Sequence, residues 1–158
     1  MAGFSHLDER GKARMVDVSN KDNTKREARA RAEVVMTPST LAAILSESLP
    51  KGDVLAAARI AGIAACKRCA DLIPLCHPLP LTSAEVAIHP VAENRLEVLV
   101  TCRVTGKTGV EMEALTGAAI AALTIYDMCK SADRGMSIES VRLVAKTGGA
   151  SGSFERAS

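Results

Sequence analysis

Alternating apolar and polar positions predict the strands of this chain. From Glu27 onward the pattern has a period of two, with charged side chains opposite a face of small or apolar ones. The small or apolar face is formed by Ala28, Ala30, Ala32, Val34 and Met36. This alternation is typical of a half-buried strand. Residues 81–91 and 95–105 alternate on either side of a polar turn and predict a hairpin, and a last strand is predicted over 137–146.

Helical spacing of apolar residues predicts three helices. Thr37 places a capping hydroxyl directly before Pro38, which favours a helix over 38–48. Asp53 can cap a second helix. The apolar stripe predicted for that helix is Val54, Ala57, Ala58, Ala61, Ala64 and Ala65. The longest helix, rich in Ala and Leu, is predicted over 110–132. Three prolines within residues 73–80 predict a rigid extended connection, because proline removes backbone donors and restricts the residue before it.

The order of these elements indicates the fold class. Strand, helices, strand, strand, helix, strand suits a split βαβ arrangement, so we expect an α+β, ferredoxin-like antiparallel sheet with helices packed on one face. Residues 1–25 mix charge, Gly and Asn without a period and predict a partly flexible N-terminal arm. Residues 26–147 form the single predicted domain, and the Gly- and Ser-rich residues 148–158 predict a flexible tail.

Composition predicts a thin core. The chain has 158 residues, of which 47% are apolar, 26 are alanine and three are aromatic. Alanine buries little area, and a domain of this size already has an unfavourable ratio of surface to volume. Burial against other copies of the chain would add stability. We therefore expect an oligomer.

Charge and cysteine usage exclude several classes of function. The formal net charge of +2 gives no electrostatic case for binding nucleic acid or a membrane. No stretch approaches the roughly 18 uninterrupted apolar residues of a membrane span, and the polar start lacks a signal-peptide pattern. Five cysteines are an odd number, which favours reduced thiols over disulfides. We expect a soluble, cytoplasmic protein.

The longest predicted helix carries candidate acid and base groups near both ends. Asp127 and Lys130 are three residues apart and therefore neighbours on one face of the helix. They fit either an ordinary surface ion pair or a pair in which each group shifts the pKa of the other. Glu111 and Glu113 lie in the first turn, where carboxylates also favour the helix dipole. Glu113 and Asp127 are separated by about 21 Å along the axis. A site that uses both needs an elongated ligand or two subunits.

A proline-framed pair and two further cysteines are the next candidates. Prolines on both sides hold Cys76 and His77 in a fixed extended backbone, which suits ligand binding, although an edge connection with a satisfied histidine fits the same pattern. Cys66 and Cys69 have the CxxC spacing of a zinc ligand pair. They lie within a predicted helix without a second such pair, so buried thiols are the better interpretation.

Lysines stand next to glycines in three places, at residues 51–52, 106–109 and 146–149. Glycine lets a ligand approach the backbone, and a helix start adds amide donors suited to phosphate. The segment 106–108 resembles a fragment of a phosphate-binding loop, but Thr101 stands where the Walker motif needs its first glycine. Three basic glycine segments predict a polyanionic small-molecule ligand.

Motifs along nearly the whole chain resemble those of one enzyme family, the cyclic pyranopterin monophosphate synthases, the C protein of molybdenum cofactor biosynthesis. The matching residues are 15–19 (MVDVS), 51–54 (KGDV), 59–63 (RIAGI), 71–79 (DLIPLCHPL), 105–116 (TGKTGVEMEALT), 121–130 (AALTIYDMCK), 141–143 and 145–146. Cys66 and Cys69 are not part of this pattern, which further weakens the zinc interpretation.

The resemblance implies a ferredoxin-like fold assembled as a homohexamer, a trimer of dimers, with active sites at dimer interfaces. It also implies conversion of a cyclised dihydroguanosine triphosphate into cyclic pyranopterin monophosphate with loss of diphosphate. No cofactor would be required, although Mg²⁺ could accompany the triphosphate. A non-catalytic nucleotide-sensing or assembly module of the same fold is the alternative.

The resemblance also assigns roles by position. Asp127 would be the catalytic acid/base, with Lys51 and Lys130 as its partners. The substrate would be bound by Leu75, Cys76, His77, Met112 and Glu113. Glu111, Arg26 and Lys146 would be further substrate contacts.

Overall fold

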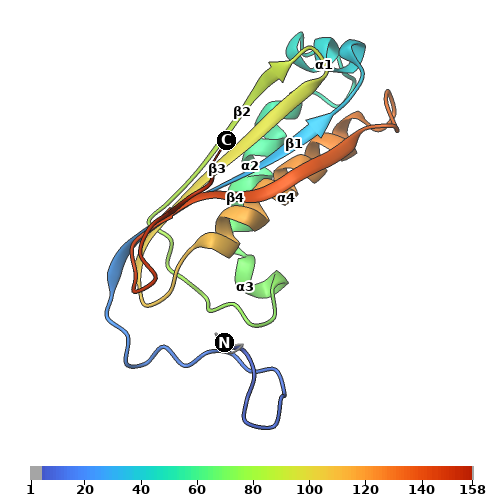
Figure 1. Ribbon diagram of the computed structural model, residues 1–158. Helices are drawn as coiled ribbons and strands as arrows, with labels where there is room; N and C mark the ends of the chain where they lie inside the picture. The colour runs from blue at the N-terminus through green and yellow to red at the C-terminus, as the bar shows by residue number, and fades with distance from the viewer. Residues whose placement is uncertain (1–4, 158) are drawn as a thin grey trace.

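One antiparallel sheet with helices against one of its faces makes up the computed structural model, which describes residues 5–157 (Figure 1). The strands are β1 (Thr24–Val35), β2 (Ser83–Ala92), β3 (Arg95–Gly106), β4 (Ser137–Thr147) and β5 (Phe154–Glu155). The helices are α1 (Pro38–Leu45), α2 (Val54–Lys67), α3 (Cys69–Leu72) and α4 (Glu111–Cys129). The strand order is β2-β3-β1-β4-β5. The predicted α+β, ferredoxin-like class is confirmed.

The core lies between the sheet and α4. The predicted face of β1 is buried, and Ala28, Ala30, Ala32 and Val34 have no exposed area. Helix α4 packs against β1, β3 and β4, and it also packs against α2. Small side chains let these elements approach closely. The buried alanines of α4 are Ala114, Ala118, Ala121 and Ala122.

Two glycines lie at a place where α2 and α4 approach closely. A Cβ on Gly62 would lie 3.2 Å from the Gly117 carbonyl oxygen, and a Cβ on Gly117 would lie 3.2 Å from the Gly62 carbonyl oxygen. The predicted stripe of α2 is therefore only partly right. The buried residues are Val54, Ala58, Gly62, Ala65 and Cys66. Ala57 and Ala61 are half-buried and Ala64 is exposed, because the buried face of α2 includes Gly62, which faces Gly117 and Ala121 of α4.

Some element ends differ from the prediction. Helix α1 stops at Leu45 rather than residue 48, because Glu47 has a φ of +54°. Helix α4 ends at Cys129 rather than residue 132, and the N–H groups of Ala132 and Asp133 bond back to the Cys129 carbonyl in a closing turn. A break at Arg68 separates α2 from α3, so the CxxC pair spans two helices. The proline-rich connection after α3 contains neither helix nor strand, as predicted.

The two ends of the chain contact the domain differently. Residues 5–23 precede β1 and contain one isolated bridge, between Leu7 and Ala13. Within residues 148–158, β5 pairs with β4 at the edge of the sheet. Among residues 5–157, α4 alone is long and apolar enough to cross a membrane by length and composition. Half of that stretch is buried inside the fold, which is the position of a core helix.

Candidate active site

Three charged side chains meet where α4 ends. Asp127 lies in the last turn of α4, Lys130 directly follows the helix, and Lys51 comes from the connection between α1 and α2. Lys130 Nζ donates a hydrogen bond to Asp127 Oδ1 at 2.7 Å. Lys51 Nζ donates to the Asp127 carbonyl oxygen at 3.0 Å and lies 3.6 Å from Oδ2. The fold thus adds a third partner to the helical pair that the sequence predicts.

The charges of this cluster favour an ionised aspartate. The hydrogen bond from Lys130, followed by the charges of Lys130 and Lys51, holds the pKa of Asp127 below its ordinary value. The side chains are roughly half exposed, at 44% for Lys51, 60% for Asp127 and 51% for Lys130. Exposed ion pairs contribute little to stability. The cluster is better suited to chemistry, because its carboxylate can accept a proton and its ammonium groups can donate one.

A second cluster surrounds the start of α4. A cavity of about 280 Å³ lies between this helix and the connection after α3. All five predicted substrate-binding residues of the two main motifs line it, together with the predicted contact Glu111. The lining comprises Leu75, Cys76, His77, Met112, Glu113, Glu111, His6, Leu79, Thr108 and Gly109. The proline-framed pair and the first turn of α4 therefore line one cavity.

His77 and Cys76 are both held in this cavity wall. His77 Nε2 makes a 2.7 Å hydrogen bond with the carbonyl oxygen of Val16, from the segment before β1. The backbone N–H of Cys76 donates to the Ile73 carbonyl at 3.1 Å, which tightens the turn before the histidine. Burial raises the pKa of the Cys76 thiol. At neutral pH Cys76 is therefore a half-buried residue of the cavity wall with an uncharged thiol.

Glu113 is the buried acid of this cavity. It is only 4% exposed, and burial raises its pKa from the ordinary 4.5 to about 7. A carboxylate placed to favour the helix dipole would keep its charge near neutral pH. Here burial outweighs the dipole, because removal from water disfavours the charged form. Glu113 can therefore act near pH 7 as either a donor or an acceptor.

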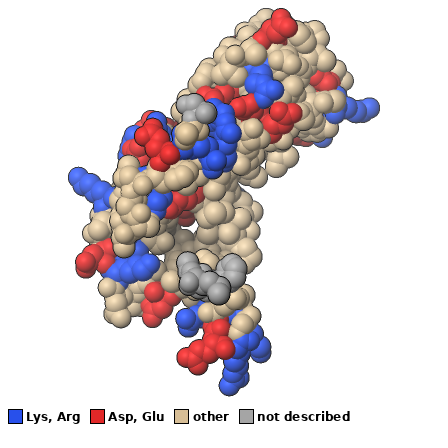
Figure 2. Space-filling model, viewed as in Figure 1, with Lys and Arg blue, Asp and Glu red and all other residues tan. Residues whose placement is uncertain are grey.

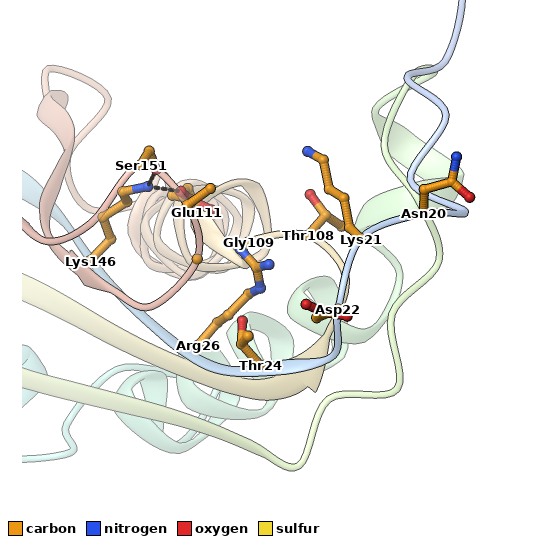
Figure 3. A pocket seen from close by; sticks show the side chains of 12 residues that line it. Asn20, Lys21, Asp22, Thr24, Arg26, Thr108, Gly109, Glu111, Lys146 and Ser151 are labelled. Carbon is orange, nitrogen blue, oxygen red and sulfur yellow. Dashed lines mark hydrogen bonds and ion pairs between the residues drawn. The ribbon is translucent and has the colours of Figure 1, made fainter.

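A larger, polar cavity of about 680 Å³ adjoins the first, and Glu111, Thr108 and Gly109 line both. Figure 3 shows Arg26 reaching from β1 toward Gly109, and Lys146 reaching from β4 toward Glu111 and Ser151. Lys146 Nζ lies 3.4 Å from Glu111 Oε1. Glu111, Arg26 and Lys146, the further substrate contacts that the family resemblance implies, thus line one cavity.

This larger cavity also has a wall that the sequence analysis missed. Asn20, Lys21, Asp22 and Thr24 line it from the segment that leads into β1. The preceding motif at residues 15–19 was the available signal.

Figure 2 shows basic and acidic side chains interspersed over the face in view, so local basic groups are offset by neighbouring acids.

The structure does not bring all the candidates together. Lys51, Asp127 and Lys130 line neither of the two cavities. They lie at the end of α4, whereas Glu111 and Glu113 lie in its first turn. Helix geometry separates Glu113 from Asp127 by about 21 Å along the axis. One chain therefore presents two separate clusters of candidate residues at opposite ends of one helix.

The CxxC cysteines behave as buried thiols. Cys66 and Cys69 are each 1% exposed. Cys69 Sγ lies 3.5 Å from the hydroxyl of Thr116, and burial raises the pKa of Cys69 to about 12. Within residues 5–157 no group of three or more His, Cys, Asp or Glu residues is placed to hold a metal ion. The prediction of buried thiols is confirmed.

Comparison with known proteins identifies the family. The model of the MoaC family matches residues 15–149. A Chloroflexus aggregans protein is 61% identical over 97% of this chain and 93% of its own length. Proteins from Pelotomaculum thermopropionicum (58% identical, 99% and 92% covered) and Roseiflexus sp. (60% identical, 98% of both chains) are equally similar. All three carry the name cyclic pyranopterin monophosphate synthase. The chain therefore belongs to the MoaC family.

Proposed function

We propose that this protein is a cyclic pyranopterin monophosphate synthase, acting as a lyase in molybdenum cofactor biosynthesis. Its substrate is the cyclised dihydroguanosine triphosphate, and its products are cyclic pyranopterin monophosphate and diphosphate. Relatives of that name share 58–61% identity over almost the whole chain. The observation that carries the proposal is the contact of Lys51 and Lys130 with Asp127, which joins two separate family motifs.

The two clusters divide the chemistry between them. The smaller cavity, with His77, Cys76 and the buried Glu113, offers mixed apolar and hydrogen-bonding groups that suit a fused heterocycle. The larger cavity offers Arg26 and Lys146, whose cationic donors suit phosphate oxygens. Any Mg²⁺ would arrive bound to the triphosphate as part of the substrate, since the carboxylates of Asp22 and Glu111 share this cavity with three basic side chains.

The cluster at Asp127 supplies proton transfer and charge neutralisation. Rearranging the ring system needs a proton removed at one atom and delivered at another, and release of diphosphate develops negative charge. The ionised Asp127 fixes the ammonium groups of Lys51 and Lys130 at the distances given above. The lysines are then proton donors and phosphate partners, and the aspartate is their orienting base.

A complete site requires two copies of the chain. The partial sites of one copy lie about 21 Å apart on a rigid helix, which is too far for direct contact with one reacting centre. Pairing the Asp127 cluster of one copy with the cavities of another joins them. This arrangement accords with the homohexamer, a trimer of dimers, that the family resemblance implies. The thin alanine core favours the same self-association.

Turnover of the cyclised triphosphate tests the proposed activity. Diphosphate release is measured for the native chain, for Lys51→Ala and for Lys130→Ala, alongside substrate affinity. Each variant should lose at least about 100-fold in kcat while keeping much of its affinity, because general acid–base groups contribute on that order. Lys12→Ala, at an exposed lysine outside both cavities, is the control. Binding without diphosphate release by the native chain would indicate a nucleotide-sensing module instead.

Mixing two impaired variants, assayed at a substrate concentration well below KM so that a lost binding contact also lowers turnover, tests the shared site. Lys130→Ala damages one partial site and His77→Ala the other, and the two chains are co-expressed. Random pairing makes about half of the dimers mixed, and each mixed dimer contains one intact site of two. Roughly a quarter of native activity should return. A mixture no more active than the better single variant would place each whole site within one copy.

A further inference from the structure

The segment before β1 reaches the binding cavity through backbone carbonyl groups. Val16 accepts the hydrogen bond from His77 at 2.7 Å, and Ser19 accepts one from Lys107 Nζ at 2.7 Å. Val16 and Val18 are half-buried, whereas Asp17, which lies between them, and Ser19, which follows them, are exposed. The segment therefore lies against the domain at this point, and we name residues 16–19 the arm turn.

Asp17 holds the arm turn in shape. Its Oδ1 accepts hydrogen bonds from the backbone N–H of Ser19 at 2.8 Å and from the Ser19 hydroxyl at 2.6 Å. These two bonds are the main reason why the pKa of Asp17 lies below its ordinary value. An aspartate that bonds the backbone two residues ahead closes a local turn. That turn fixes the direction of the carbonyl groups on both sides of it.

The bond to Val16 decides which nitrogen of His77 carries hydrogen. A carbonyl oxygen can only accept, so Nε2 must be the protonated nitrogen. In the neutral ring the other nitrogen, Nδ1, is then an acceptor. Without the Val16 carbonyl, the neutral His77 ring could adopt either tautomer. A substrate N–H or O–H group is recognised only by the tautomer with a free Nδ1.

We infer that Asp17 is a positioning residue, whose turn aims the Val16 carbonyl at His77 and so presents Nδ1 as a hydrogen-bond acceptor to the substrate. The same turn places the Ser19 carbonyl on Lys107, next to Thr108 in the cavity wall. Asp17 itself touches neither cavity. This inference rests on the proposed function only in taking His77 as a substrate contact.

Nuclear magnetic resonance of the histidine ring tests the inference without turnover. Nitrogen-15 labelled native chain should show His77 as the tautomer with hydrogen on Nε2. Asp17→Ala removes both turn bonds and should give a mixture of tautomers. Asp17→Asn keeps an oxygen that accepts from the Ser19 N–H and should restore the native signal. An unchanged His77 signal in Asp17→Ala would overturn the inference.

Asp8→Ala is a matched control within the same segment. Asp8 Oδ1 also closes a local turn, accepting from the N–H groups of Arg10 at 2.9 Å and Lys12 at 2.8 Å. Its loss should leave the His77 tautomer native. Equal disturbance by Asp8→Ala and Asp17→Ala would show general loosening of the segment and would also overturn the inference.

Steady-state kinetics then link the tautomer to substrate binding. Asp17→Ala should raise KM by about 5- to 20-fold with kcat within about twofold, since a lost binding contact changes KM. Added to His77→Ala, it should change KM little further if it acts through that ring. A fall in kcat with an unchanged KM would overturn the inference. If the inference about Asp17 fails, the native chain should still release diphosphate. Failure of the inference is therefore distinguishable from failure of the proposed function, in which the native chain releases none.

Discussion

The buried carboxyl group of Glu113 makes stability depend on pH in a predictable direction. Its pKa is raised by burial from the ordinary 4.5 to about 7. Each pKa unit corresponds to about 1.4 kcal/mol, so ionising Glu113 in the folded chain costs about 3 kcal/mol more than in the unfolded chain. Below pH 4.5 the group is neutral in both states and this cost is absent.

The sign follows from proton binding. Between the unfolded pKa of 4.5 and the folded pKa of about 7, the folded chain holds more protons on Glu113 than the unfolded chain. Stability falls with rising pH wherever the folded state binds more protons. The free energy of unfolding should therefore decrease by about 3 kcal/mol from pH 4.5 to pH 8 on account of this residue.

Urea denaturation of the native chain and Glu113→Gln measures this effect. The glutamine is neutral at every pH, so the difference in unfolding free energy between the two proteins isolates the Glu113 carboxyl. Glu93→Gln, in the exposed turn between β2 and β3, is the control for exchanging a carboxylate that is not buried. A difference for Glu113→Gln that stays constant with pH would refute the reasoning, because it would mean that Glu113 ionises as it does in water.

Three further predictions concern packing, capping and the charged cluster. Gly117→Ala should lower the unfolding free energy by about 1–3 kcal/mol by overpacking against Cys66 Sγ. Adding Cys66→Ala should recover part of that loss, and a zero coupling energy in a double-mutant cycle would contradict the contact. Asp53→Ala removes the 2.9 Å cap of α2 and should cost about 1 kcal/mol in urea denaturation, whereas Asp53→Asn should cost less. Asp127→Ala should abolish diphosphate release while changing the unfolding free energy by less than about 1 kcal/mol, because exposed ion pairs are weak; a larger loss of stability would make the cluster structural.

The fold was predictable because its patterns are local. Alternation in β1 assigns Ala28 to Val34 correctly to the buried face, and the caps at Thr37 and Asp53 locate the starts of two helices. The stripe of α2 was only partly predictable. Periodicity places an apolar face within about one residue, but the position of closest approach depends on a glycine in another helix, Gly117. That information is not local to α2.

Candidate residues were predictable as types, but their surroundings were not. The spacing of Asp127 and Lys130 indicates an ion pair, yet only the folded chain adds Lys51 across 76 positions. Position in a first helical turn suggests that Glu113 is charged, yet burial raises its pKa to about 7, so that the protonated and ionised forms coexist at pH 7. The part of the larger cavity's wall formed by Asn20 to Thr24 was missed, because an irregular segment has no hydrophobic periodicity from which its position could be predicted.

The small residues of α4 explain both its packing and the separation of the candidate residues at its two ends. Ala114, Ala118 and Ala122 let the helix lie directly on the sheet, and Gly117, whose added Cβ would also lie 3.2 Å from Val100 of β3, lets α2 pack beside it on the same face. A helix that packs along its length against the sheet and α2 stays straight, so its two ends remain apart. Its ionisable residues are excluded from the clamped middle, since a buried charge without a partner is costly. They gather instead at the two ends, a fixed distance of about 21 Å apart. The packing that stabilises one copy thus holds these two groups of residues apart, which is the reason why the proposed function pairs two copies of the chain.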